Sequence, residues 1–326
     1  MTAFIIRRLM QSIIVVAVMS FLVFGGVNLV GDPVEMMVSE EADQQERERV
    51  IRSMGLDKPW YVQYGLFVTK AVQGDLGKSF VYGEEALGII VQRMPATFEL
   101  ALAALLMAIL IGIPLGVFAG LKPEARSSKI ILTGSILGFS LPTFWVGLMF
   151  IMVFAVMLGW LPSTGRGETV PIFGIGVSFL TADGLAHLIL PALNLALYKI
   201  SLVIRLTRAG TREIVHQDYI KFARAKGLSI KRVIFVHLMK NILIPVVTVL
   251  GLEFGGLIAF SVVTETVFAW PGMGKLIIDS IQGLDRPVIV AYLMIIVLVF
   301  VVINLLVDVL YSVLDPRVRV QDVKHE

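Results

Sequence analysis

The sequence predicts an all-α, polytopic integral membrane protein with about six transmembrane helices. Of its 326 residues, 57% are hydrophobic and 16% are charged, and the mean hydropathy is +0.85. Soluble domains carry about 25% charged residues, so this chain has too little polar surface to cover itself in water. The apolar residues also fall in runs of roughly 20 or more, the length that crosses about 30 Å of hydrocarbon. Both observations place the chain in a bilayer.

The apolar runs predict six spans, and an even number of crossings puts both termini on one side of the membrane. The predicted spans are Leu9–Val30, Phe98–Leu121, Ile130–Leu158, Leu185–Ile204, Ile242–Phe268 and Val288–Leu314. The first span follows Arg7 and Arg8, as a secretory signal would. It is longer than an ordinary signal core and has no convincing cleavage site, so we interpret it as a retained anchor.

Basic residues near the span ends predict the orientation, because Lys and Arg are retained on the cytoplasmic side. The connection after the third span has only Arg166 beside Glu168 and Asp183. The connection after the fourth span is strongly basic, with Arg205, Arg208, Arg212, Lys221, Arg224, Lys226, Lys231, Arg232 and Lys240. We therefore expect the N- and C-termini to be cytoplasmic and the segment after the first span to be external.

These assignments divide the chain into four parts. They are a cytoplasmic tip with the first span at 1–30, an external segment at 31–95, a five-helix core at 96–315 that includes the cytoplasmic loop 205–241, and a cytoplasmic tail at 316–326.

In the external segment, apolar residues near helical spacing predict two short amphipathic helices. The residues concerned are Val50, Ile51, Met54 and Leu56, and then Trp60, Tyr61, Tyr64, Phe67 and Val68. The helices either cap a pathway or bind a soluble partner, or they lie at the membrane interface, anchored by their aromatic residues.

The most informative polar stretch runs from Asp218 to Gly227. Asp218 is a residue type that caps helix N-termini, and Gly227 favours the left-handed conformation that ends a helix. The two residues predict a helix of about two turns. Tyr219, Phe222 and Ala223 lie at i, i+3 and i+4 and should share one face of it. A short helix with an apolar patch is expected to dock on something.

Ser229 then predicts the start of a second helix, which runs through Val233, Ile234 and His237 into the fifth span. The two helices would form a helix–turn–helix at the membrane surface. From the residues alone, this basic element fits docking on a protein and also attraction to anionic lipid.

The stretch from Asp218 to Leu228 resembles the "EAA" loop of permease subunits in bacterial binding-protein-dependent ABC importers, in the form found in the oligopeptide/dipeptide/nickel permease family. Lys221 and Phe222 stand where the general pattern has Glu and its first Ala. Other segments resemble the same family in order along the chain: Phe4–Leu9, Met54–Tyr64, Gly74–Ser79, Arg93–Leu100, Ser140–Gly147, Gly159–Pro162 and Thr264–Gly274.

The resemblance implies a type I ABC importer permease fold in the bacterial plasma (inner) membrane. It implies that the loop helix docks in a cleft of an ATP-hydrolysing subunit through Asp218, Tyr219, Phe222, Ala223, Arg224, Ala225 and Gly227. The implied partners are a homologous second permease subunit, two ATP-binding subunits and a periplasmic or other extracytoplasmic substrate-binding protein. Di- or oligopeptides are the implied substrate, with nickel chelates or another small solute as the alternative, and no nucleic acid is expected.

The sequence lacks the residues that an enzyme of the common classes would need. A P-loop requires Gly, four residues and then Gly-Lys-Ser/Thr, whereas Gly274-Lys275 is followed by Leu276 and Ala269 replaces the first Gly. We interpret this segment as an external turn. There is no cysteine, and the histidines are scattered at His187, His216, His237 and His325. We therefore expect a non-catalytic subunit with no cofactor and no metal.

Polar residues inside the spans are the candidates for a translocation pathway, because such residues are costly in hydrocarbon and usually face a cavity or a partner. Glu253 in the fifth span, Asn304 in the sixth and Glu265 near the outer end of the fifth are the predicted pore-lining residues. The alternative is that they bind neighbouring helices. A passive channel or an ion-coupled carrier would also have six spans with carboxylates, but neither needs the docking loop.

Two further expectations concern the helices themselves. Glu99 follows Pro95 and should stabilise a helix N-terminus. Four prolines should interrupt helical runs and permit two packings of one bundle, and the glycine-rich patch from Gly251 to Gly256 should allow close helix contact. The prolines are Pro114, Pro142, Pro191 and Pro245.

Overall fold

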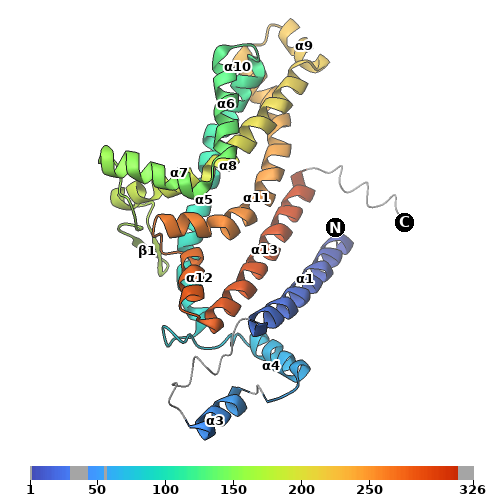
Figure 1. The fold of residues 1–326 in the computed structure, drawn as a ribbon. Helices are drawn as coiled ribbons and strands as arrows, with labels where there is room; N and C mark the ends of the chain where they lie inside the picture. Colours follow the sequence, from blue (N-terminus) through green and yellow to red (C-terminus); the bar gives the residue numbers. More distant parts are fainter. Residues whose placement is uncertain (1, 30–42, 55–56, 315–326) are drawn as a thin grey trace. The chain divides into compact units, whose positions relative to one another are not determined.

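The computed structural model describes residues 2–29, 43–54 and 57–314, and the described chain is almost entirely helical (Figure 1). The predicted tail at 316–326, Leu56 and residues 31–42 of the predicted external segment lie outside the described residues. Among the described residues, five helices are long and apolar enough to cross a membrane, and a bent helix pair supplies a sixth span if it counts as one. The prediction of an all-α membrane protein with about six spans is confirmed.

The chain folds into two compact units. The first unit comprises Met1–Met94 and Lys275–Val302, and the second comprises Pro95–Gly274 and Ile303–Glu326. The first unit contains α1 (Thr2–Leu29), α3 (Gln44–Met54) and α4 (Trp60–Val72), with most of α12 (Met273–Gln282) and the first part of α13 (Arg286–Leu314).

Helix α4 packs on α1 through aromatic rings. The ring of Phe21 meets Trp60 and Tyr64 edge-on, with centroids 6.2 and 5.6 Å apart. Phe24 packs on Tyr64 and Phe67 at 5.5 and 5.7 Å. These contacts explain the spacing of the aromatic residues, since positions 60, 64 and 67 lie on one face of a helix.

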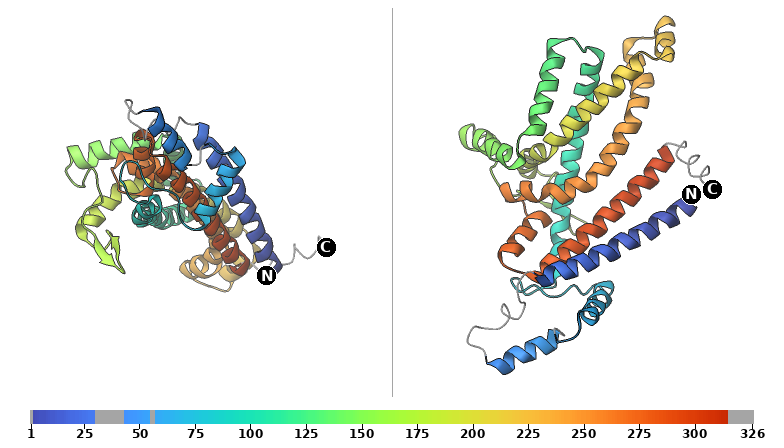
Figure 2. Two further views of the ribbon diagram at one scale, coloured as in Figure 1. Left: turned by 90° about the horizontal axis from the view of Figure 1, so that it is seen from below. Right: turned by 45° about the vertical axis from the view of Figure 1, so that its right-hand side comes forward.

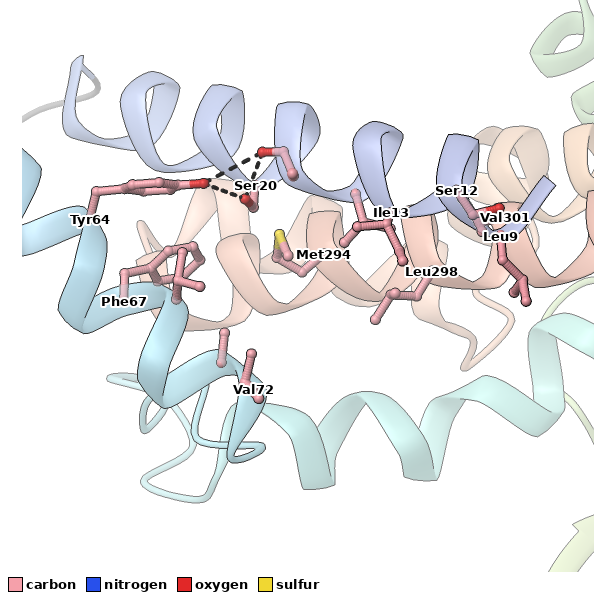
Figure 3. Close-up of a pocket in the computed structure, with 14 residues that line it drawn as sticks. Leu9, Ser12, Ile13, Ser20, Tyr64, Phe67, Val72, Met294, Leu298 and Val301 are labelled. Atoms are coloured by element: carbon pink, nitrogen blue, oxygen red, sulfur yellow. Dashed lines mark hydrogen bonds between the residues drawn. The ribbon is translucent and has the colours of Figure 1, made fainter. Parts of the chain in front are cut away.

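An apolar pocket of about 510 Å³ lies between α1, α4 and α13 within the first unit (Figure 3). The hydroxyls of Ser20 and Tyr64 lie 2.8 Å apart at its edge and hydrogen-bond to each other. Its other labelled lining residues include Leu9, Ile13, Phe67, Val72, Met294, Leu298 and Val301. Apart from the hydroxyls of Ser12, Ser20 and Tyr64, the side chains that line the pocket are apolar.

The second unit is built around α8. Its long helices are α5 (Ala86–Leu121, which starts in the first unit), α6 (Arg126–Ser140), α8 (Ala182–Val215) and α11 (Met239–Val267). Helix α8 contacts both α6 and α11, as Figure 1 shows.

Small residues allow α5 to approach α8 closely. A Cβ placed on Gly116 would lie 2.6 Å from Thr207 Cβ, and Gly112 and Gly120 are equally tight, one turn away on either side. In the glycine patch singled out in the sequence, Gly251 is similarly close to Val307.

The predicted third span is broken. Helix α6 ends at Ser140, and α7 (Thr143–Phe150) continues into the π-helix η1 (Ile151–Met157) after a bend of 109°. Pro142 causes the break, because the residue before a proline is pushed out of the helical region, and Leu141 has φ −83° and ψ 138°. Pro142 therefore interrupts this run as expected, and Ile130–Leu158 is a single span only if the bent helix pair counts as one.

The other prolines do not interrupt their helices, contrary to expectation. Pro95 and Pro114 lie inside α5, Pro191 inside α8 and Pro245 inside α11. Packed neighbouring helices and local adjustments compensate for the missing N–H group of a proline in a membrane helix. Because α5 begins at Ala86, Pro95 marks no helix start.

Short elements connect the long helices of the second unit. The hairpin of β1 (Val170–Ile172) and β2 (Ile175–Val177) is antiparallel and pairs Val170 with Val177. Its two-residue turn has positive φ at Phe173 and Gly174, as the twist of a tight hairpin requires. Beyond α8, the chain forms α9 (Asp218–Ala225), α10 (Ile230–Arg232) and the π-helix η2 (Val233–Leu238), which leads directly into α11.

Candidate functional site

Helix α9 lies at the end of the second unit where α8 and η2 meet (Figure 2). Its N-terminus differs from the prediction, because Gln217 is the N-cap residue and Asp218 is the first helical residue. Asp218 makes no capping bond; its carboxylate accepts a hydrogen bond from Lys221 Nζ at 2.9 Å. The Lys221 ammonium holds the pKa of Asp218 below its usual value.

The C-terminus of α9 confirms the prediction made for Gly227, which has φ +75°. Gly227 N donates to Arg224 O at 2.9 Å, and Leu228 N donates to Ala223 O at 3.3 Å. This pair of bonds is the Schellman motif, which needs a residue in the left-handed conformation. Ser229 caps α10 as predicted, since its hydroxyl accepts from Arg232 N at 3.4 Å.

The apolar residues of α9 are divided between two faces. Ile220 and Ala223 are buried in a small core with Val233. Tyr219 and Phe222 are exposed, at 44% and 61%. The single face predicted for Tyr219, Phe222 and Ala223 is therefore wrong, because Ala223 joins Ile220 in holding the helix to the protein. Tyr219 and Phe222 form what we name the aromatic face of α9.

Polar and basic groups surround the aromatic face. Tyr219 Oη accepts a hydrogen bond from Asn241 Nδ2 at 3.0 Å, which ties the ring to the start of α11. Lys226 Nζ lies 4.6 Å from the centroid of the Phe222 ring. Arg224 and Ala225 are also exposed. The helix thus presents two aromatic rings beside cationic groups, on a backbone fixed at both ends.

Glu253 forms an ion pair with Lys199, which links α11 to α8. The Lys199 side chain is only 9% exposed, whereas that of Glu253 is 35% exposed. Asn304, on the part of α13 that belongs to the second unit, is half-buried. The structure does not bring Glu253 together with Glu265, which lies 12 positions further along α11, or roughly 18 Å.

Glu265 is completely buried and reaches no surface in this conformation. Its carboxylate accepts hydrogen bonds from Thr97 Oγ1 at 2.7 Å and from Ser261 Oγ at 2.9 Å. A Cβ placed on Gly272 would lie 2.4 Å from Glu265 Oε2, and one on Gly274 would lie 2.6 Å from the backbone of α11. These glycines therefore pack a turn over a buried carboxylate, and they do not form a phosphate-binding loop.

The sequence missed the role of Glu99, which lies in the interior of α5 and not at a helix N-terminus. Its carboxylate accepts from Arg166 Nη2 at 2.5 Å and from Arg166 Nε at 3.0 Å. It also accepts from Ser178 N, Ser178 Oγ and Phe179 N at 2.7 to 2.9 Å. Arg166 further donates to Gly176 O at 2.6 Å. Glu99 therefore clamps the hairpin loop onto α5.

Asp285 plays a similar part in the first unit. It is fully buried, accepts a hydrogen bond from Ser79 Oγ and binds the backbone N–H of Phe80 at 3.1 Å. Neither carboxylate site could be predicted from the sequence, because the partners are distant along the chain.

Family models and known relatives cover nearly the whole chain. Residues 112–320 match the "Binding-protein-dependent transport system inner membrane component" family, and residues 1–101 match the N-terminal model of such membrane components. The di/tripeptide transport system permease protein DppB of Pseudomonas aeruginosa is 40% identical over 98% of this chain and 100% of its own length. The oligopeptide transport system permease protein AppB of Bacillus subtilis is 40% identical with the same coverage. The glutathione transport system permease protein GsiC of Escherichia coli K12 is 37% identical, over 98% and 99%.

Among solved structures, the inward-facing MetNI methionine ABC transporter aligns with a TM-score of 0.55 and 17% identity, over 70% of this chain and 97% of that one. At this identity the similarity shows the fold alone, which is that of an ABC importer permease. The full-length relatives are permease subunits, which are not catalytic, since separate subunits hydrolyse the ATP. Together with the helical spans, they place this chain in the inner membrane as a multi-pass protein. The chain belongs to the family of inner membrane components of binding-protein-dependent transport systems.

Proposed function

We propose that this chain forms half of the translocation pathway of an ABC importer for peptides and that α9 couples it to a separate ATPase subunit. The aromatic face of α9 carries the proposal. Two exposed rings at the end of a membrane protein are unfavourable in water, and they stand beside cationic groups on a helix that Ile220 and Ala223 anchor. Such a rigid, amphipathic surface suits a protein cleft.

The proposal includes the predicted orientation. The basic residues from Arg205 to Lys240 lie at the end of the second unit that carries α9 and favour the cytoplasm for this end. A second permease subunit of similar fold, two ATP-binding subunits and an external binding protein would complete the importer. Peptides are the proposed substrate because the relatives at 37–40% identity are permeases for dipeptides, tripeptides, oligopeptides and glutathione.

Photo-cross-linking tests the docking partner of α9. A photoreactive phenylalanine analogue at position 222 should give an adduct with the ATPase subunit in the purified complex. The same analogue at Phe173, a fully exposed residue at the tip of the β-hairpin, should give none. Adducts of residue 222 with phospholipid alone would show that α9 binds the membrane surface, which is the alternative for a basic helix.

Uptake measurements test coupling and substrate together. Vesicles with the whole complex and its binding protein should accumulate radiolabelled trialanine when ATP is present. Phe222→Ala should lower this uptake about tenfold or more, since a buried aromatic anchor is typically worth 2 kcal/mol or more. Leu110→Ala, at an exposed apolar position of α5, is the matched control and should leave uptake unchanged. Accumulation of a nickel chelate without trialanine would favour the alternative substrate.

A further inference from the structure

The Lys199–Glu253 ion pair joins two candidate spans at positions far from the ends of both helices. On α11, the nearest charged residues are Lys240 and Glu265, 13 and 12 positions away, or roughly 18–20 Å along the helix. Lys199 lies near the middle of α8, and no other Lys, Arg, Asp or Glu lies between Asp183 and Arg205. The setting of the pair is mainly apolar, with Arg205 as a further cation that lies 4.8 Å from the Phe139 ring.

The two partners are buried to different degrees, and this difference indicates what they face. Lys199 is 9% exposed, but Glu253 keeps 35% of its side-chain surface. The only hydrogen bond that its carboxylate makes with the described residues is from Lys199 to Oε2, although a carboxylate accepts about four. A carboxylate with open surface at this depth is very costly against lipid, so it faces a water-filled path or a polar partner.

An aromatic surface adjoins the pair. Lys199 Nζ lies 5.0 Å from the centroid of the Tyr198 ring, which is 40% exposed and stacks on Phe139 at 4.8 Å. Both Glu253 and Tyr198 therefore contact the same ammonium group. A cation, an anion and adjoining aromatic rings together complement a molecule that has both charged ends and apolar side chains.

We propose that Lys199 and Glu253 form a binding station for the free α-carboxylate and α-ammonium of a peptide in transit. This inference rests on the proposed function and names the chemistry recognised inside the pathway. In the empty chain the two groups bind each other. A buried charge left without a partner is strongly unfavourable, so the pair separates only when a zwitterion supplies both replacement charges. A peptide capped at both termini supplies neither.

The absence of cysteine from the chain allows a single thiol to report on the pair. Gly256 lies one turn after Glu253, and the only atom that a Cβ there meets within 4 Å is Glu253 Oε2, at 3.9 Å, so Gly256→Cys fits without strain. Leu252→Cys, at an exposed neighbouring position, is the second reporter should the first fail to assemble. Glu168→Cys, in the exposed hairpin loop, is the reactive control.

The experiment uses the membrane complex of both permease subunits and both ATP-binding subunits, with cysteine-free partners and no binding protein. The rate of thiol modification by a charged methanethiosulfonate reagent is measured alone, with trialanine and with N-acetyl-trialanine amide. We expect saturating trialanine to slow modification of Gly256→Cys about tenfold, because a bound peptide covers the carboxylate face beside it. The capped peptide should not slow it, and neither peptide should affect Glu168→Cys.

The double variant Lys199→Gln/Glu253→Gln separates recognition from structure. It leaves no unpaired charge, so the complex should assemble, yet the protection by trialanine should disappear. The proposal is wrong if neither reporter reacts with the reagent, if both peptides protect equally, or if the double variant retains protection. Uptake of trialanine by the complete importer is measured in parallel. A complex that takes up trialanine but shows no protection refutes the station alone, whereas one that takes up no peptide refutes the proposed function.

Discussion

Replacing Glu99 by alanine should open the loop between η1 and α8. Glu99 is 6% exposed and Arg166 is 15% exposed, and the carboxylate accepts two hydrogen bonds from this guanidinium and three from Ser178 and Phe179. Removing one partner of a buried ion pair costs about 3–5 kcal/mol. Arg166 keeps its bond to Gly176 O, so we take the lower end, about 3 kcal/mol.

A cost of about 3 kcal/mol shifts the equilibrium between the closed and the open loop about 100-fold toward the open loop, because each 1.4 kcal/mol is a factor of ten. Trypsin cleaves after arginine, and Arg166 is protected while Glu99 holds it. In the purified, detergent-solubilised protein, Glu99→Ala should therefore be cut after Arg166 about 100 times faster than the parent. Glu168→Ala removes an exposed carboxylate from the same loop and should be cut at the parent rate. Equal rates for the two variants would refute the clamp.

Three further predictions follow from close packing and burial. Gly116→Ala puts a Cβ 2.6 Å from Thr207 Cβ and 2.8 Å from Ile204 O. The folded fraction of the detergent-extracted protein, measured by size-exclusion chromatography, should therefore fall sharply. Gly134→Ala puts a Cβ in open space and should not change this fraction. Ile220→Ala leaves a cavity that should lower stability by about 2–5 kcal/mol and should speed amide hydrogen exchange across α9. Phe222 is exposed, so Phe222→Ala should change that exchange little. Asp285→Ala removes the acceptor of the buried Ser79 hydroxyl and of the Phe80 N–H and should make trypsin cut after Lys78 more readily.

The features that the sequence predicted correctly are those coded by neighbouring residues. The length of the spans, the glycine turn that ends α9 and the serine cap of α10 each depend on a few adjacent positions. Gly227 takes the left-handed conformation because a Schellman turn requires it there, and Ser229 caps the next helix. The N-terminus of α9 was misplaced by one residue, because Asp218 is a good residue at the first helical position as well as at the cap.

The features that the sequence could not predict depend on long-range contacts. Glu99 and Arg166 are 67 positions apart, and Ser79 and Asp285 are 206 apart. No periodicity links such pairs. Glu99 was assigned to a helix start because Pro95 precedes it, but α5 continues through this proline. In a membrane bundle, neighbouring helices decide whether a proline breaks a helix, and of the four prolines expected to do so only Pro142 does.

Helix α9, the proposed coupling helix, and the proposed station share the same two long helices, which connects the two proposals. Helix α9 lies between the end of α8, which carries Lys199, and the start of the η2–α11 helix, which carries Glu253. Ile220 and Ala223 pack on Val233 of η2, and the Schellman turn at Gly227 leaves little slack between α9 and α10. A displacement of α9 by the proposed ATPase subunit would therefore be passed to α8 and α11 together. Any relative movement of these helices changes the distance between Lys199 and Glu253, so ATP-driven motion at α9 would open or close the station directly.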